Sequence, residues 1–111
     1  MNKTVFQRIM DGEIHADLIY QNSSVFAIHD NQPQAPVHCL IITKEPFCSF
    51  EQIPESLFID IQKAIVEVAS IMKIRDTGYR VVTNIGKDGG QSIPHLHFHV
   101  LGGKRLSSRI G

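Results

Sequence analysis

The spacing of hydrophobic and polar residues changes along the chain and predicts a succession of short elements. Two apolar runs, 18–21 and 25–29, flank a polar turn and predict a β-hairpin. A third strand is predicted over 37–42, after a loop that contains two prolines. Residues 4–10 are typical of a short helix that Thr4 is placed to cap, with an apolar side formed by Phe6, Ile9 and Met10.

The second half of the chain opens with a long amphipathic segment. Between residue 54 and about residue 75, apolar positions recur at three- and four-residue steps, which predicts a helix with Pro54 in its first turn and Gly78 at its exit. Two further strands are predicted over 79–83 and 96–101, and a glycine-rich loop over 84–90 follows the first of them. The helical stripe that should face the core consists of Leu57, Ile61, Ile65, Val68, Ala69 and Met72.

The order of these elements, α-β-β-β-α-β-β, predicts the fold class. Runs of adjacent strands, rather than strict alternation with helices, favour an α+β domain with an antiparallel sheet and with helices packed on one side of it. A chain of 111 residues without an internal repeat forms one domain. A domain of this size buries only about two-thirds of its unfolded surface, so we also expect a dimer.

Three histidines alternate with apolar residues in the last predicted strand. On a strand, Leu96, Phe98 and Val100 point to one face, and the three imidazoles of 95–99 point to the other. Stability alone does not require such a face, because histidine has only a middling strand propensity. The histidine face is therefore a candidate site.

Three interpretations of this face compete. A solvated strand surface is the simplest, although such surfaces usually carry Thr, Lys and Glu. A zinc site is the second, but the first and third imidazoles of a straight strand lie about 13 Å apart and cannot share one ion. No acidic or thiolate partner stands close to them in the sequence. Phosphoryl or nucleotidyl chemistry is the third interpretation, and we favour it.

The loop that precedes the histidines supports the third interpretation. Glycines tolerate positive φ and allow backbone N–H groups to converge on an anion, so the loop that contains Gly86, Gly89 and Gly90 could hold a phosphate beside the imidazoles. A plain turn explains the loop equally well when it is taken alone. Its position next to the histidines is what favours a phosphate site.

Charge and composition narrow the range of partners and locations. Eleven basic residues balance eleven acidic ones, so the electrostatic footprint of a nucleic-acid-binding protein is missing. Neither a signal-peptide core nor a run of eighteen apolar residues is present, and we expect a cytoplasmic protein without a membrane partner. Cys39 and Cys48 do not form a Cys-x-x-Cys pair and should stay reduced. His15 is interpreted as a surface histidine of a turn.

The segment His95-Leu96-His97-Phe98-His99-Val100-Leu101 resembles the signature of the histidine-triad (HIT) superfamily. The similarity extends to residues 29–38, 88–92 and 101–103, which look like the Hint branch of histidine-triad nucleotide-binding proteins. This resemblance implies a HIT-like fold, namely a five-stranded antiparallel sheet with one long and one short helix. It also implies a homodimer in which the partner continues the sheet to ten strands.

The resemblance assigns catalytic roles position by position. His97 matches the nucleophile that attacks the α-phosphorus and becomes transiently nucleotidylated. His99 matches a histidine that contacts the α-phosphate, and His95 would pair with His38 behind them. Ser92 matches a serine that hydrogen-bonds the phosphate or the departing group.

The resemblance also implies a purine-nucleotide site and a reaction. The expected substrate is a purine nucleoside 5′-phosphoramidate or an aminoacyl-adenylate-like compound, hydrolysed to the nucleoside monophosphate without a required cofactor. The alternatives are a nucleotide-binding regulatory or scaffolding module with incidental hydrolysis, a dinucleoside polyphosphate hydrolase, and a zinc protein. Asp30 would hold the ribose, the base would contact Phe6, Ile9, Ile28, His29 and Asn31, and the phosphate would contact Asn84, Gly90, Gln91, Ser92, His97 and His99.

Overall fold

Helix α1 (Val5–Met10) forms where the sequence places its capping residue. In this computed structural model, which describes residues 3–110, the Thr4 hydroxyl accepts a hydrogen bond from the Gln7 backbone N–H. The Gln7 side-chain oxygen accepts one from the Thr4 N–H in return, which completes a capping box. The predicted short helix is confirmed; Phe6 is its buried residue, whereas Met10 is exposed.

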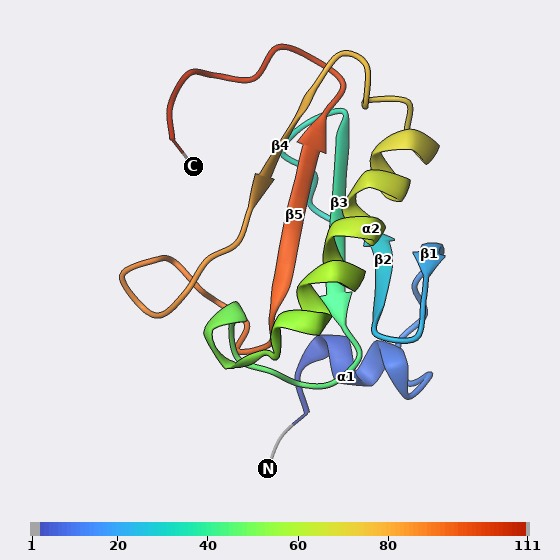
Figure 1. Ribbon diagram of the computed structural model, residues 1–111, viewed down its shortest axis with the longest axis vertical. Helices are drawn as coiled ribbons and strands as arrows, with labels where there is room; N and C mark the ends of the chain where they lie inside the picture. The colour runs from blue at the N-terminus through green and yellow to red at the C-terminus, as the bar shows by residue number, and fades with distance from the viewer. Residues whose placement is uncertain (1–2, 111) are drawn as a thin grey trace.

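The sheet has five antiparallel strands in the spatial order β1-β2-β3-β5-β4 (Figure 1). A long helix, α2 (Glu55–Ile71), and a short 3-10 turn, η1 (Phe50–Gln52), lie between β3 and β4 in the sequence. The predicted α+β class is confirmed, with one long and one short α-helix. The strands are β1 (Leu18–Gln21), β2 (Val25–His29), β3 (Val37–Thr43), β4 (Tyr79–Val82) and β5 (His97–Gly102).

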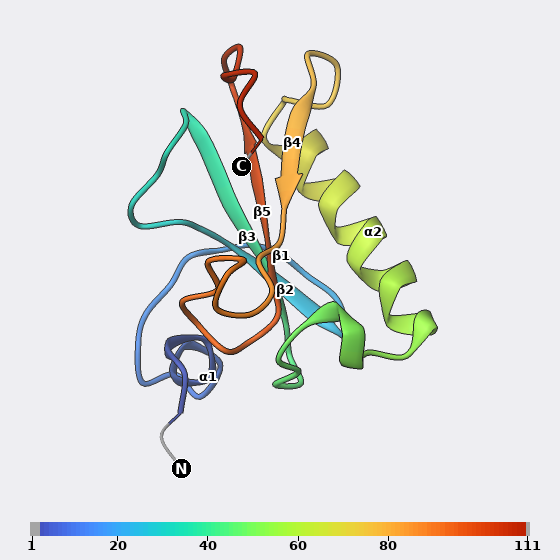
Figure 2. The ribbon, with the colours of Figure 1, turned by 90° about the vertical axis from the view of Figure 1, so that its left-hand side faces the viewer.

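The two α-helices pack on opposite faces of the sheet, which corrects the expectation that they share one side (Figure 2). Helix α2 covers the face that carries Ala27, Cys39 and Ile41, and α1 packs through Phe6 against the face that carries Leu40. The apolar run over 39–42 is buried at every position, as expected of a strand covered on both faces. That continuous apolar run was the sequence signal that both faces of the sheet are covered. The signal was missed because α1 is too short to suggest a covering layer by itself.

Helix α2 ends earlier than the sequence predicts. Its C-cap is Met72, and Lys73 adopts a left-handed conformation at φ 60°. The Ile74 N–H then donates to the Ala69 carbonyl and the Lys73 N–H to the Ser70 carbonyl, the hydrogen-bond pattern of a Schellman motif. Ile74 is buried, so packing of the residue after the cap offsets the strain of a non-glycine left-handed residue. Gly78 instead precedes β4.

The centre of the sheet positions the histidines. Strands β3 and β5 pair so that Ile42 lies opposite His97 and Leu40 opposite His99. Both strands have neighbours on each side. The β4 ladder reaches His99 but not His97, whose backbone carbonyl accepts the Thr83 hydroxyl on that edge instead. Over residues 3–110, none of the helices has the length and apolar character needed to cross a membrane.

Candidate active site

The alternation at the start of β5 separates core from site as predicted. Leu96, Phe98 and Val100 join the core beneath α2, and His97 and His99 lie on the opposite face with ring centroids 5.2 Å apart. The strand begins at His97 rather than at residue 96, so His95 lies in the bend before it. The three rings differ in exposure: His95 is 0% exposed, His97 is 9% exposed and His99 is half-buried.

The hydrogen bond of His97 fixes which of its ring nitrogens can react. Nδ1 lies 2.7 Å from the backbone carbonyl oxygen of His95, and a carbonyl can only accept, so Nδ1 carries the proton. Burial lowers the pKa of His97 below its ordinary value of 6.5, opposed by that hydrogen bond and by the charge of Asp30. A neutral ring protonated on Nδ1 has its lone pair on Nε2. His97 lines the cavity described below, so the unprotonated nitrogen belongs to a ring on the cavity wall.

His95 does not pair with His38, which corrects the role that the resemblance implied. Its Nε2–H donates to the carbonyl of Thr43 at 2.7 Å, and its Nδ1 lies 3.2 Å from the hydroxyl of Thr4. Burial lowers the pKa of His95, so the ring is neutral and Nδ1 accepts the Thr4 O–H. The register of β3 against β5 explains the correction. His95 lies just outside the end of the ladder where Ile42 pairs with His97, whereas His38 lies near the other end, opposite Leu101.

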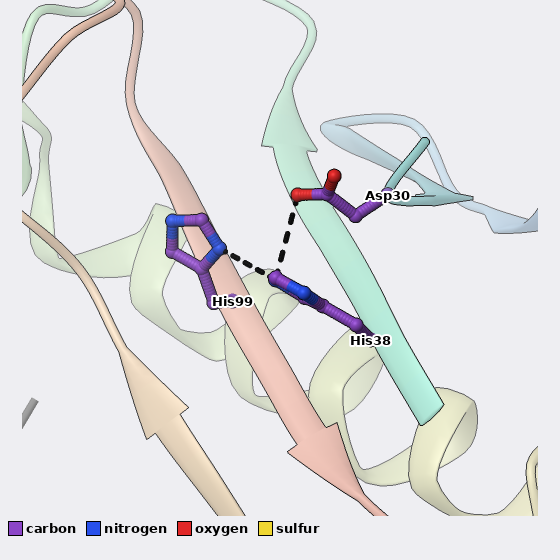
Figure 3. Close-up of side chains that lie close together, drawn as sticks. All are labelled: Asp30, His38 and His99. Carbon is purple, nitrogen blue, oxygen red and sulfur yellow. Dashed lines mark hydrogen bonds and ion pairs between the residues drawn. The ribbon is translucent and has the colours of Figure 1, made fainter. Parts of the chain in front are cut away.

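His38 pairs with His99 instead, and Asp30 completes the group (Figure 3). The Gln34 backbone N–H donates to Nδ1 of His38 at 3.0 Å, so the proton of neutral His38 is on Nε2. That N–H donates to Nδ1 of His99 at 2.9 Å and also lies 3.4 Å from Oδ2 of Asp30. His99 therefore carries its own proton on Nε2. The chain of donors makes His99 a neutral hydrogen-bond donor on the wall of the cavity.

The same contacts explain why His99 resists protonation. Its pKa is lowered to about 4, first by burial and then by the neighbouring His97 and His38, against the charge of Asp30. A second proton on His99 would have to sit on Nδ1, which already accepts the His38 N–H. Near neutral pH His99 can therefore donate a hydrogen bond without carrying a charge.

Asp30, His38 and His99 are also the described residues that come nearest to a metal site, with one ligand atom from each within 4.8 Å of the others. The sequence did not place an acidic partner beside the histidines, and the fold does so through Asp30. A metal-bound histidine usually donates its second ring N–H to an acceptor. Here the second nitrogen of His38 faces a donor, the Gln34 N–H. A metal on Nε2 of His38 would place two N–H groups against each other, so this donor set fits hydrogen bonding better than metal ligation.

The glycine-rich loop is held in shape by side-chain amides. The Gln91 side-chain oxygen accepts from the Gly86 N–H, and its amide group donates to the carbonyls of Cys48 and Ile93. These bonds occupy both amide hydrogens of Gln91, which makes the residue a support for the loop. A side chain at Gly89 would place its Cβ 2.2 Å from the Ile85 carbonyl oxygen, so only glycine fits there.

A cavity of about 720 Å³ lies on the histidine face, and residues of α1 and of the glycine-rich loop line it. All of the residues that the resemblance assigned to nucleotide contact line it, whereas His38 and His95 stand behind it. Asp30 also accepts the Gln32 N–H, so it caps its own loop as well. The sequence did not indicate the remaining lining residues: Val5, Ile14, His15, Ala16, Asp17, Gln32, Leu40 and Ile93.

The segment between α1 and β1 accounts for half of the missed residues. His15 is solvated as expected, with 87% of its side chain exposed, yet it also lies at the cavity beside Asp17, which it contacts at 2.9 Å. Ile14 and Ala16 are apolar residues in a polar turn. Their apolar character was the sequence signal that this turn packs against another part of the protein or against a ligand. Their cavity-facing position could not be inferred without the placement of α1.

The fold and the histidine site together define a class that known proteins share. The HIT domain model matches residues 11–106, and a HIT-like protein from Chlamydia pneumoniae is 45% identical over 108 residues, which cover 95% of this chain and 97% of that protein. The chain therefore belongs to the HIT domain family.

Solved structures agree with this membership. A HIT family hydrolase from Clostridium thermocellum superposes with a TM-score of 0.92 at 41% identity, over 99% of this chain and 98% of that one. A histidine triad nucleotide-binding protein from Candida albicans superposes with a TM-score of 0.83 at 25% identity, over 98% and 87% of the two chains. The chain thus shares its fold with a HIT family hydrolase.

Proposed function

We propose that this protein hydrolyses purine nucleoside 5′-phosphoramidates, or aminoacyl-adenylate-like compounds, through a nucleotidylated His97, as a member of the Hint branch. The observation that carries the proposal is the hydrogen bond from the His97 Nδ1–H to the His95 carbonyl. This bond leaves Nε2 unprotonated, with its lone pair available, on a ring that lines the cavity. The similar structures include a HIT family hydrolase and a histidine triad nucleotide-binding protein, which supports hydrolysis and nucleotide binding in general terms.

The reaction has two in-line steps. In the first, Nε2 of His97 forms a bond to phosphorus, the P–N bond breaks, and the amine leaves with a proton taken from water in the open cavity. The imidazolium that results keeps its Nδ1–H on the His95 carbonyl, whose dipole stabilises the positive charge. In the second step, water attacks phosphorus and gives its proton to the hydroxide left by the first step. The bond between phosphorus and Nε2 breaks, the monophosphate leaves, and neutral His97 is restored.

The remaining cavity residues bind and orient the substrate in this proposal. His99 donates its Nε2–H to a non-bridging phosphate oxygen, and the exposed hydroxyl of Ser92 contacts the phosphate or the departing group. Asp30 holds the ribose, and the base lies against Phe6 and its apolar neighbours. Asn84 donates to the Gly89 carbonyl and so acts by shaping the loop along the phosphate.

The reaction as proposed requires no metal. Charge on the phosphate is met by neutral donors, and the group most similar to a metal site, Asp30 with His38 and His99, has its protons placed for hydrogen bonding. Dialysis against a chelator should therefore leave kcat/KM unchanged. A loss restored by zinc would contradict this part of the proposal.

The proposed function is tested by products and by substrate class. Adenosine 5′-phosphoramidate should yield AMP and ammonia in equal amounts, with a kcat/KM at least tenfold above that for a dinucleoside polyphosphate. His97→Ala should still bind AMP, as followed by calorimetry, and release no ammonia. Equal turnover of both substrates would favour the dinucleotide hydrolase, and AMP binding without turnover by the wild-type protein would favour the binding module.

We also propose a homodimer in which two copies join their sheets. Strand β4 is an edge strand of the described sheet, and Val81 on it is 42% exposed. An unpaired edge of this kind can pair with a second copy, which would give the ten-stranded sheet. Light scattering should report twice the mass of one chain, and Val81→Pro should reduce it to that of a monomer.

A further inference from the structure

The Thr4 hydroxyl bonds to two groups that belong to different parts of the molecule. It accepts the Gln7 N–H as the cap of α1, and it lies 3.2 Å from Nδ1 of His95. A hydroxyl has one donor and two acceptor positions, so it can do both at once. The start of the first helix is therefore bonded directly to the segment that precedes the nucleophile.

The direction of this bond is determined by the other nitrogen of His95. Nε2 faces the Thr43 carbonyl at 2.7 Å, so Nε2 carries the proton of the neutral ring. Nδ1 is then an acceptor, and the Thr4 O–H must be its donor. His95 is 0% exposed, so water cannot replace Thr4 without opening the structure.

The position of His95 in turn determines the orientation of His97. The carbonyl of His95 accepts the His97 Nδ1–H, and β5 begins only at His97, so ladder hydrogen bonds do not hold His95. The ring of His95 is pinned between α1 and the end of β3 instead. Phe6 lies on the helix that Thr4 caps, and its ring packs edge-on against both imidazoles. Its ring centroid lies 5.5 Å from that of His95 and 4.9 Å from that of His97.

We propose that Thr4 is a positioning residue of the active site: its hydroxyl locks the tautomer and orientation of His95, and through the His95 carbonyl those of His97. Because Phe6 also lines the ligand cavity, the helix that contacts the ligand is the helix that aligns the nucleophile. The catalytic consequence rests on the proposed function. The hydrogen-bond assignment does not, because it concerns the protein alone.

The first test measures the rings of the wild-type protein. Histidine ring ¹⁵N chemical shifts distinguish the two tautomers, and we expect His95 protonated on Nε2 only and His97 protonated on Nδ1 only. Both rings should keep these states to a lower pH than a free imidazole does, because burial lowers their pKa values. His95 protonated on Nδ1 overturns the proposal whether or not the protein hydrolyses any nucleotide.

The second test separates the hydroxyl from the helix cap. Thr4→Val retains the side-chain shape and removes the donor, and we expect kcat to fall about tenfold with KM within about twofold, since one buried hydrogen bond is lost. Thr4→Ser should restore both kcat and the His95 shifts. Gln7→Ala breaks the capping box without removing the hydroxyl, and should lower the melting temperature while leaving kcat unchanged.

Two results would overturn the proposal. One is a Thr4→Val protein with wild-type ring shifts and wild-type kcat. The other is a Gln7→Ala protein with the same loss of kcat as Thr4→Val, because the effect would then come from the helix cap. If Thr4→Val does not fold, the ring shifts of the wild-type protein and of Thr4→Ser still decide the matter.

Discussion

The two faces of strand β5 differ in what holds them. Leu96, Phe98 and Val100 point into an apolar core. Other apolar side chains of similar volume could replace them, because their contribution is the burial of apolar surface. On the other face, each histidine has a particular hydrogen-bond partner that determines which nitrogen carries the proton. One face therefore contributes stability and the other chemistry, and alternation of residues along one strand keeps them apart.

The comparison predicts its largest effect at His97. His97→Ala should lower kcat/KM by at least about 10⁴-fold, since the variant lacks the group that forms the covalent intermediate in the proposed reaction. The free energy of unfolding should fall by about 1–3 kcal/mol, because the variant leaves the buried His95 carbonyl without its donor but removes no part of the apolar core. Steady-state kinetics and urea titration on the same sample check both numbers.

The opposite result is expected one residue along the strand. Phe98→Ala should destabilise the fold by about 3–5 kcal/mol, through the lost burial and the cavity left behind. The kcat of the folded fraction should stay within about twofold of the wild type, and Phe98→Leu provides a milder version if the alanine variant does not fold. A specific loss of kcat in folded Phe98→Leu would show that the two faces are not separate.

Acid should destabilise the protein through the histidine face. The unfolded chain takes up protons near pH 6.5, whereas burial keeps His99 unprotonated down to about pH 4, so the free energy of unfolding falls as the pH drops through this window. His99 contributes about 3 kcal/mol of this fall by pH 4, and His95 and His97 act in the same direction. Urea titrations at pH 7 and pH 4.5 measure it.

The control variants for acid sensitivity are chosen by exposure. His99→Gln should reduce the dependence on pH, and His15→Gln, at a solvated position, should leave it unchanged. The activity should also decline on the acid side, since His97 must be neutral to attack, with a midpoint below pH 6.5. A midpoint above pH 6.5 would contradict the assigned state of His97.

A smaller effect is expected behind the cavity, at His38. His38→Phe removes the donor to His99 and should lower kcat about tenfold, because His99 is then free to adopt the tautomer that cannot donate. His38→Gln keeps an amide N–H in the place of Nε2 and should restore part of the loss. Equal activity of the phenylalanine and wild-type proteins would remove His38 from the account.

The sequence predicted those features that depend on local spacing. Period-two alternation placed Leu96 and Phe98 on the core face and the histidines on the other, and the capping signal at Thr4 located α1. Both follow from the geometry of a strand or of a helix end, which short segments determine by themselves.

The features that the sequence did not predict depend on contacts between distant segments. The partners of His95 are Thr4 and Thr43, and the tautomer of His38 depends on the backbone of Gln34; such pairings require the register of β3 against β5 and the position of α1. The placement of α1 on the second face was missed for the same reason. Lys73 at the left-handed helix end was missed because packing of the next residue outweighed the usual preference for glycine.

The central claim is that Nε2 of His97 forms a covalent bond to phosphorus. Rapid mixing with adenosine 5′-phosphoramidate, followed by an alkaline quench and peptide mass spectrometry, tests it directly. We predict an adenylyl group on the peptide that contains 95–99, located at His97, that forms and decays at rates consistent with turnover. Turnover without this adduct, or an adduct on another residue, would contradict the account.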